Sequence, residues 1–158
     1  MIRRLFFKDV NIIWGIINKA AYAYKGVIPN DRYYEPYMPK EELLREMRSI
    51  TFFGWHEERK LIGVMGFQTV GDVTLIRHAY VLPDYQQKGI GMKLLNHMKK
   101  LTKTKYLLVG TWADASWAIK FYQKHGFQFM PNKDELLREY WNIPERQIDA
   151  SVVLCAEV

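Results

Sequence analysis

Hydrophobic residues recur with two distinct periods along the chain, and these periods separate expected helices from expected strands. Apolar residues spaced three and four apart predict helices, whereas short runs rich in β-branched and aromatic residues between turn residues predict strands. The expected helices span residues 9–24, 40–50, 89–102, 116–125 and 135–141. The expected strands span residues 2–6, 51–56, 61–70, 73–81, 106–111, 127–130 and 151–158.

The order of these elements predicts an α/β protein with a mixed sheet. Strands 51–56, 61–70 and 73–81 form a meander, and the helix after it crosses over to a strand parallel to 73–81. Residues 106–111 are apolar at most positions, which is typical of a strand buried on both faces. The 158 residues suit one domain, 1–158. Between the first two long helices, residues 25–39 carry three prolines and three tyrosines and are expected to form a stiff lid.

Composition excludes several classes of protein. Apolar residues make up 49% of the chain and charged residues 25%, which is ordinary for a globular domain. The single cysteine, Cys155, excludes a disulfide framework and a multi-cysteine zinc site. His56, His97 and His125 lack metal-ligand spacing and are expected at the surface or at helix ends, so no metal site is expected. No segment approaches the roughly 20 apolar residues of a membrane helix, and no signal-peptide cleavage site is present, so we expect a cytoplasmic protein without membrane contact.

The positive charge is concentrated in one stretch. The chain has 23 lysines and arginines against 17 acidic residues, and residues 86–105 contain six lysines and no acid. Such a patch attracts polyanions, either nucleic acid or a phosphorylated small molecule, although it is also what a solvated helix face looks like. Because aromatic residues do not interleave with these lysines, nucleic acid is not the expected partner.

The most informative segment is the junction between strand 73–81 and the helix that follows it. It reads Val-Leu-Pro-Asp-Tyr-Gln-Gln-Lys-Gly-Ile-Gly-Met over residues 81–92. The first N–H groups of a helix have no intrahelical acceptor and bind phosphate, and Gly89 and Gly91 let an anion approach the backbone. A P-loop is excluded because Met92 follows Gly91, and a dinucleotide fold fits weakly because Leu94 stands where a small residue is needed.

Two motifs in this half of the chain resemble one known family. Gln86-x-x-Gly89-x-Gly91, after a strand that ends Val-x-Pro, resembles the acetyl-CoA loop of the GNAT family of N-acetyltransferases. Residues 118–127, Ala-Ile-Lys-Phe-Tyr-Gln-Lys-His-Gly-Phe, resemble that family's Ala-x-x-Phe-Tyr-x-x-x-Gly-Phe helix. The resemblance covers residues 74–129. It implies the GNAT fold, with a mixed, mostly antiparallel sheet, a central parallel strand pair splayed for coenzyme A, and flanking helices.

The resemblance also implies roles for particular residues. The pantetheine arm of the cofactor, acetyl-CoA or coenzyme A, would run along the strand end, and its pyrophosphate would bind the loop. Tyr122 would act as general acid toward the departing thiolate, although a tyrosine packed on the sheet is the alternative. A backbone N–H near Tyr80 would hold the tetrahedral oxyanion. The expected cofactor-binding residues are Ala79, Tyr80, Val81, Gln86, Gln87, Lys88, Gly89, Ile90, Gly91 and Met92.

The chain departs from the family at three positions. Ala115 stands where many relatives carry an asparagine that binds pantetheine, and the effect of this change on cofactor binding is left open. Gly110 and Thr74 stand at the two positions where some relatives carry a catalytic glutamate. Another general base is therefore needed. His78 is the first candidate, because strand alternation places it on the face of Thr74 and an imidazole accepts protons near neutral pH. A packed or hydrogen-bonded histidine is the alternative, and Asp114 is a weaker candidate base.

The resemblance places the acceptor beneath the first helices and the loop between them. Asp31 and Glu35 are the carboxylates expected to hold an amine there. We expect acetyl transfer from acetyl-CoA to a primary amine by direct attack in a ternary complex, with a small-molecule or peptide amine as acceptor. The alternative function is a catalytically silent sensor that binds acetyl-CoA, and a homodimer is expected. The aromatic residues expected around the acceptor are Tyr22, Tyr24, Tyr33, Tyr34, Tyr37, Trp112 and Trp117.

Overall fold

The computed structural model describes all 158 residues. The chain folds into two compact units. The first unit comprises Met1–Ala23, Tyr34–Gln68 and Ile76–Leu101, and the second comprises Tyr24–Tyr33, Thr69–Leu75 and Thr102–Val158. The expectation of a single domain stays a prediction. None of the helices has the length and apolar character that crossing a membrane requires.

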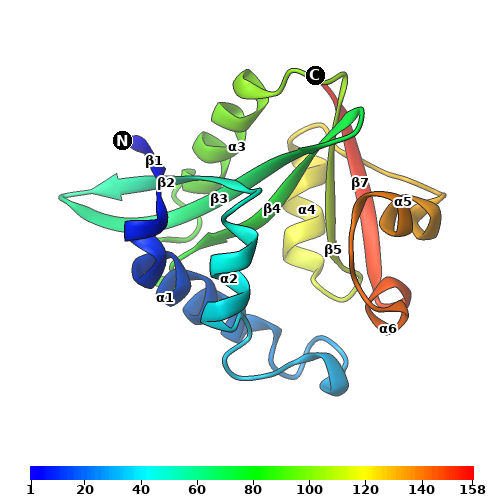
Figure 1. Cartoon of the computed structure of the whole chain (residues 1–158), viewed down its shortest axis with the longest axis horizontal. Helices are drawn as coiled ribbons and strands as arrows, with labels where there is room; N and C mark the ends of the chain where they lie inside the picture. Colours follow the sequence, from blue (N-terminus) through cyan, green and yellow to red (C-terminus); the bar gives the residue numbers. More distant parts are fainter. The chain divides into compact units, whose positions relative to one another are not determined.

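The elements follow the order predicted from the sequence, and they build one mixed sheet (Figure 1). The strand order is β1-β2-β3-β4-β5-β7-β6, and β4 and β5, which α3 connects, are the parallel pair in an otherwise antiparallel sheet. The strands are β1 (Ile2–Leu5), β2 (Thr51–Glu57), β3 (Lys60–Val70), β4 (Val73–Val81), β5 (Tyr106–Trp112), β6 (Gln128–Phe129) and β7 (Ser151–Glu157). The helices are α1 (Val10–Ala21), α2 (Lys40–Glu46), α3 (Ile90–Leu101), α4 (Ser116–Lys124), α5 (Lys133–Tyr140) and α6 (Glu145–Asp149).

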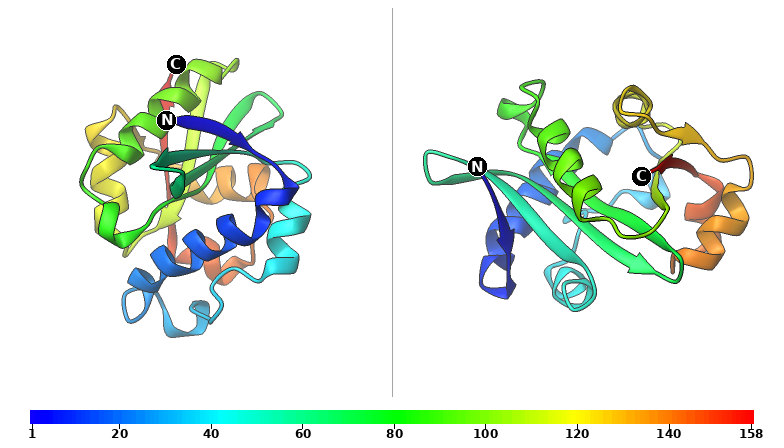
Figure 2. Two further views of the ribbon diagram at one scale, coloured as in Figure 1. Left: turned by 90° about the vertical axis from the view of Figure 1, so that its left-hand side faces the viewer. Right: turned by 90° about the horizontal axis from the view of Figure 1, so that it is seen from above.

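In the first unit, helices cover both faces of the strands. Figure 2 shows α1 and α2 on one side of β1–β3 and α3 on the other. Phe52 and Val64 pack with Ile13 of α1 in one core cluster. On the opposite face, a Cβ added to Gly63 would meet Ile90 at 3.1 Å. The sheet of this unit is therefore buried on both sides, and β4 reaches its end between two helical layers.

The segment that leads into α2 is fixed by side chains of α1. Trp14 donates from Nε1 to the carbonyl of Met38 at 2.7 Å. Asn18 donates from Nδ2 to the same carbonyl at 3.1 Å and accepts the N–H of Met38 at 2.8 Å. Because Met38 lies two residues before α2, these bonds set where that helix begins.

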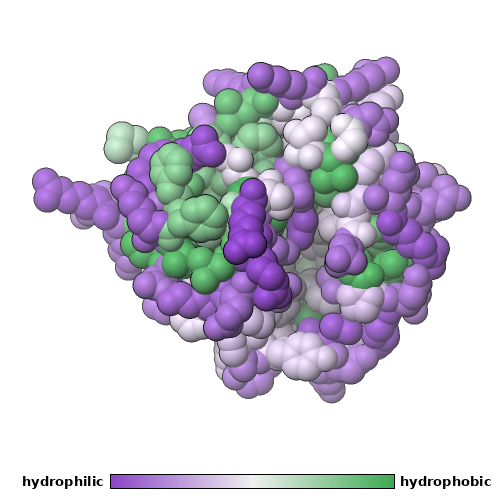
Figure 3. Space-filling model, in the orientation of Figure 1, coloured by the Kyte–Doolittle hydropathy of each residue, from purple (hydrophilic) through white to green (hydrophobic).

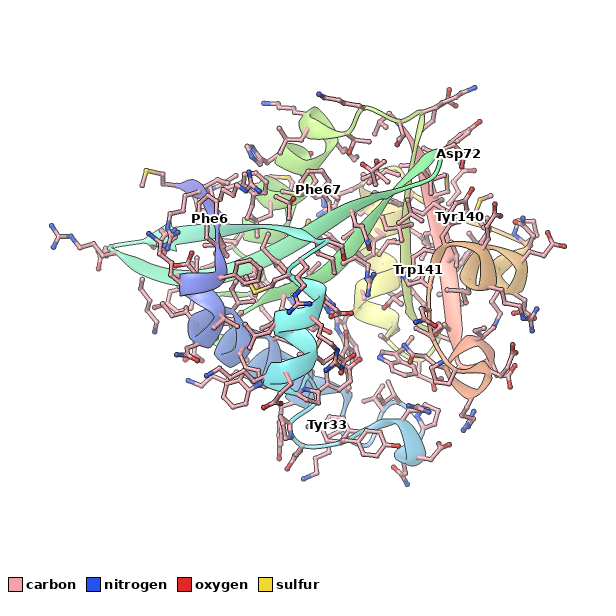
Figure 4. All side chains as sticks on the ribbon, in the orientation of Figure 1. Phe6, Tyr33, Phe67, Asp72, Tyr140 and Trp141 are labelled. Atoms are coloured by element: carbon pink, nitrogen blue, oxygen red, sulfur yellow. The ribbon has the colours of Figure 1, made fainter.

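The second unit has its own core beside β5 and β7. Leu137 of α5, Ile148 of α6 and Val153 of β7 are its buried residues. Tyr140 donates its hydroxyl hydrogen to Asp72 in the β3–β4 turn at 2.7 Å (Figure 4). This hydrogen bond raises the pKa of Tyr140 to about 12. The bond ties the turn to α5 within the unit.

The structure differs from the sequence-based expectations in three elements. Helix α6 was not predicted, because its five residues are too short to show a helical period. β6 is two residues long, shorter than the expected 127–130. In β4, His78 has a φ of +53°, which interrupts the regular alternation of a strand, so alternation alone does not assign its face.

An exposed apolar patch lies near the N-terminus. Phe6 and Phe7 after β1 are 49% and 54% exposed, and Ile12 of α1 is 51% exposed. Figure 4 labels Phe6 near the end of β1, and Figure 3, in the same orientation, shows hydrophobic surface on that side of the molecule. The homodimer expected from the sequence stays a prediction.

His56 is not the surface residue that the sequence indicated. Its Nε2 accepts a hydrogen bond from Arg3 Nε at 3.2 Å, and its Nδ1 is buried without a partner. Arg3 also pairs with Asp9, which accepts the N–H of Phe6. Burial lowers the pKa of His56, and the charges of Arg3 and the N-terminal amine lower it further. The imidazole is therefore held in its neutral form.

We predict that acidification destabilises the protein through His56. In the unfolded chain this imidazole binds a proton near pH 6.5, but the folded state resists protonation, so the unfolded state holds more protons at mildly acidic pH. The urea midpoint should therefore fall between about pH 7 and pH 5, and it should fall less in His56→Gln. Equilibrium unfolding at several pH values measures this. Equal pH slopes for the two proteins would contradict the prediction.

Candidate functional site

The first part of the site is the loop between β4 and α3, which the sequence identified as an anion site. After β4, residues Pro83–Tyr85 form a 3-10 turn, η4. Gln86 then donates from Nε2 to the carbonyl of Val81 at 3.0 Å, which closes the loop onto the strand end. Gln87 and Gly89 follow with φ values of +63° and +80°. The left-handed residues turn the backbone so that successive N–H groups converge, an arrangement that binds anions.

The N–H groups of this loop are left without partners in the chain. The first hydrogen bond of α3 runs from Lys93 to the carbonyl of Gly89 at 3.1 Å, and no N–H from Gln87 to Met92 bonds to a backbone carbonyl. A Cβ at Gly89 would have only Met92 within 4 Å, so glycine is needed there for its φ rather than for space. The loop is therefore a preformed cradle of N–H donors at a helix start.

Basic side chains surround this cradle. The ammonium groups of Lys60 and Lys88 lie 5.4 and 5.3 Å from the ring centre of Tyr85, and Lys93 lies 4.5 Å from that of Trp55. These contacts hold three flexible cations near the loop. The chemistry of the donors and the charge both suit a phosphate or diphosphate.

The second part of the site lies on β4, where the strand is distorted. His78 adopts a left-handed backbone conformation that a non-glycine residue rarely takes. Its ring stacks on Phe52 with centroids 6.1 Å apart and planes 12° apart. Its Nε2 lies 2.7 Å from Oε2 of Glu46. His78 is therefore hydrogen-bonded in the structure, as the alternative interpretation of the sequence had it, and its partner is the carboxylate of Glu46.

Glu46, the last residue of α2, links three polar side chains of the first unit. Its Oε1 accepts a hydrogen bond from Arg77 Nη2 at 2.9 Å, and Arg77 Nη1 donates to Gln68 at 3.1 Å. Burial raises the pKa of Glu46, but the hydrogen bond and charge of His78 and the charges of Arg77 and Arg45 outweigh burial and lower it. Glu46 is therefore an anion, and it meets two side chains that follow one another along β4.

The two family positions for a catalytic glutamate are closed in this chain. A Cβ at Gly110 would lie 3.3 Å from the ring of Trp141, which packs there with Leu137. Thr74 is fully buried, and its hydroxyl lies 2.8 Å from that of Thr104, which donates to the carbonyl of Tyr106. A longer side chain at Gly110 would need the Trp141 ring to move, and one at Thr74 would displace a buried hydroxyl pair.

Tyr122 is the buried residue of α4 in the second unit. Its ring packs edge-on against Phe121 and Phe127, with centroids 5.1 and 5.3 Å away. Burial raises its pKa well above the usual value of a phenol, and Tyr24 adds to the shift. The phenol therefore stays protonated at neutral pH, as a proton donor must. Ala115, where relatives carry asparagine, is buried at the start of α4.

The segment expected over the acceptor holds ion pairs and ring contacts of its own. Asp31 pairs with Arg146 of α6 at 2.9 Å, and this hydrogen bond lowers the pKa of Asp31. Asp31 therefore already has a cationic partner. Tyr24 stacks on Trp117 with ring centroids 5.9 Å apart. Asp114, the weaker candidate base, is exposed in the turn before α4.

The first unit contains His78, the strand residues Ala79–Val81 and the loop residues Gln86–Met92. Tyr122 belongs to the second unit.

The sequence analysis missed Glu46, because Glu46 belongs to no motif and contacts β4 only through the placement of α2. The only feature of the sequence that could have indicated Glu46 is its position, as a carboxylate in the last turn of the helix before the meander. No group of acidic, histidine or cysteine side chains could hold a metal ion.

Known proteins give independent information about the chain. Residues 48–129 match the model of the acetyltransferase (GNAT) domain. Spermidine N(1)-acetyltransferase of Thermoplasma acidophilum is 28% identical over 141 residues, which cover 80% of this chain and 87% of that protein.

Solved structures share the fold. The PaiA N-acetyltransferase of Thermoplasma acidophilum, crystallised with coenzyme A, has a TM-score of 0.78 and 21% identity, covering 100% of this chain and 98% of its own. The ribosomal-protein-S18-alanine N-acetyltransferase of Escherichia coli has a TM-score of 0.72 and 18% identity, covering 100% and 93%. Both have the fold expected from the loop and helix motifs. Because the family model matches just over half of the residues, the chain belongs to the GNAT family of acetyltransferases.

Proposed function

We propose that this protein transfers an acetyl group from acetyl-CoA to a primary amine by direct attack in a ternary complex. The observation that carries the proposal is the row of N–H groups from Gln87 to Met92 that have no carbonyl partner in the chain. Together with Lys60 and Lys88 beside Tyr85, this row suits the diphosphate of coenzyme A. Family membership supports the same cofactor.

Acetyl-CoA would supply an activated thioester, and the chain's residues would bind the cofactor and protonate the thiolate that leaves. We propose that the loop binds the diphosphate and that the backbone of Ala79, Tyr80 and Val81 binds the pantetheine arm. Gln86 acts indirectly, because its side chain closes the loop onto Val81. A backbone N–H near Tyr80 would stabilise the oxyanion of the acetyl carbonyl.

The amine must lose a proton before it attacks. A lysine-like amine has a pKa near 10.4, so only about 0.04% is neutral at pH 7. Removing that proton accounts for roughly 4–5 kcal/mol of the barrier. His78 is the proposed base. The neutral amine then forms the C–N bond, the C–S bond breaks, and Tyr122 gives its proton to the departing thiolate. The nitrogen loses its second proton to solvent, and solvent returns a proton to Tyr122.

Among amines, a polyamine is the acceptor to test first. The reason is the similarity over 80% of the chain to a spermidine N(1)-acetyltransferase. The ion pair of Asp31 with Arg146 does not add to this support, because it occupies one of the carboxylates expected to hold an amine. The proposal is therefore primary-amine acetylation, with spermidine as its first specific case.

A thiol-release assay with acetyl-CoA tests this function. The panel contains spermidine, a free amino acid, an aminoglycoside and a peptide with N-terminal alanine, and mass spectrometry identifies the product. We expect amine-dependent thiol release with a mass gain of one acetyl group on at least one amine. Coenzyme binding by calorimetry without turnover on any amine would favour the silent sensor instead.

Gly89→Ala is expected to weaken coenzyme A binding about tenfold, or about 1.4 kcal/mol. An alanine is strained at a φ of +80°, so the loop would shift and its N–H groups would diverge. Calorimetric titration with coenzyme A measures the change. Gly71→Ala, with a φ of +58° in the β3–β4 turn, is the matched control and should bind normally. Equal affinity for Gly89→Ala and wild type would exclude the loop as the diphosphate site.

Tyr122→Phe is expected to lower kcat about 10–1000-fold with little change in coenzyme affinity. The substitution keeps the ring contacts with Phe121 and Phe127 and removes only the hydroxyl. Steady-state kinetics with the active amine measure the effect. Tyr140→Phe, which also removes a hydroxyl, is the control and should keep its kcat. An unchanged kcat in Tyr122→Phe would remove this residue from the mechanism.

A further inference from the structure

We propose that Glu46 is a positioning residue that makes His78 the general base of the reaction. The proposal rests on the acetyl transfer proposed above, and it identifies the residue that orients the general base. Its basis is a contact between two elements, the end of α2 and the distorted middle of β4, that no sequence motif connects.

The hydrogen-bond pattern determines which nitrogen of His78 can accept a proton. An ionised carboxylate only accepts hydrogen bonds, so the 2.7 Å contact with Glu46 requires His78 to carry its hydrogen on Nε2. In the neutral form of the ring, this bond places the lone pair on Nδ1. That nitrogen has no hydrogen-bond partner in the structure. A neutral imidazole with one nitrogen fixed by a carboxylate and the other open is the arrangement of a general base.

The imidazole is also fixed in orientation. Phe52 packs against its face, and the left-handed backbone sets where its side chain leaves β4. Its side chain is 14% exposed, so it is neither freely mobile nor sealed from solvent. A base that must meet an amine at one place needs this restriction, because orientation lowers the entropic cost of proton transfer.

Glu46 is itself held by a second partner. Arg77 binds its other carboxylate oxygen at 2.9 Å, and Gln68 accepts a second hydrogen bond from the same guanidinium. The carboxylate is therefore fixed from both sides, and it stays ionised beside His78. The charged groups that act on this pair are Arg77 on β4 and Arg45 on α2.

The same contacts explain how the proton is accommodated. The amine's N–H bond breaks and its proton forms a bond to Nδ1, which converts the imidazole to an imidazolium. The positive charge is then shared with Glu46 through the Nε2 hydrogen bond, while the amine keeps the electron pair that attacks the acetyl carbon. Solvent takes the proton from Nδ1 after each turnover.

The test is the pH dependence of kcat in Glu46→Gln, measured with the amine that the panel identifies. Glutamine keeps the side-chain shape but loses the charge that favours a protonated neighbour. We expect the acidic limb of the profile to move to lower pH and kcat on the plateau to fall about tenfold. Glu41→Gln, an exposed carboxylate on the same helix, is the matched control and should keep the wild-type profile.

A double-variant cycle separates positioning from a structural effect. His78→Gln should lower kcat about 100-fold or more, and adding Glu46→Gln to it should cost little further, because Glu46 acts through His78. Melting temperature and coenzyme affinity are measured for every variant. Losses that multiply in the double variant, or an acidic limb that stays at its wild-type position in Glu46→Gln, would overturn the proposal.

Glu46→Asp keeps the proposal testable if glutamine destabilises the fold. Aspartate retains the charge at a slightly greater distance, so the acidic limb should stay close to its wild-type position, whereas His78→Gln should have no acidic limb. A limb in Glu46→Asp that is lost, or displaced as far as in a folded Glu46→Gln, would show that the charge is not what matters. An inactive wild type on every amine would instead refute acetyl transfer, so the two failures are distinct.

Discussion

The site in the first unit depends on backbone N–H groups that the chain does not satisfy itself. Every helix begins with N–H groups that lack an intrahelical acceptor. The helices α1, α2, α4, α5 and α6 also lack a side-chain cap, and what sets the start of α3 apart is the pair of left-handed residues before it, Gln87 and Gly89. An unsatisfied buried donor would cost about 1–3 kcal/mol, but Gln87 and Lys88 of this loop are exposed, so solvent can reach that part of it. The loop is thus tolerated without a ligand and prepared for one.

A second departure from regular structure occurs at His78, where β4 takes a left-handed turn. A non-glycine residue in this conformation costs about 1–2 kcal/mol, and such strain persists only where neighbouring contacts maintain it. Here those contacts are the ring of Phe52 and the carboxylate of Glu46. Trp14 and Asn18 contribute indirectly, because they fix Met38 and so the start of the helix that ends at Glu46. A chain of local contacts in the first unit therefore maintains the one irregular residue of the strand.

The sequence predicted those features that depend on neighbours along the chain. The bounds of β4, the loop with Gln86 and Gly89, and the helix around Tyr122 follow from hydrophobic period, glycine positions and motif spacing, and the family model confirms the family. Features that depend on packing were missed. Helix α6 is too short to show a hydrophobic period. His56 accepts a hydrogen bond from Arg3, which is distant in the sequence. Glu46 contacts β4 only because α2 packs on the sheet. No pattern of residue types along one chain reports such a contact.

The surroundings of Gly110 and Thr74 are consistent with the absence of the acidic residues that some family members carry there. At Gly110 the ring of Trp141 lies 3.3 Å from where a Cβ would be, and at Thr74 the side chain is buried in a hydroxyl pair with Thr104. Burying an unpaired carboxylate is strongly unfavourable, so neither position accepts one without changes in its neighbours. On α2, by contrast, Glu46 meets Arg77 as well as His78, and it is only partly buried. A carboxylate can remain charged at that place, and the acid–base chemistry that we propose is located where the fold can support the charge.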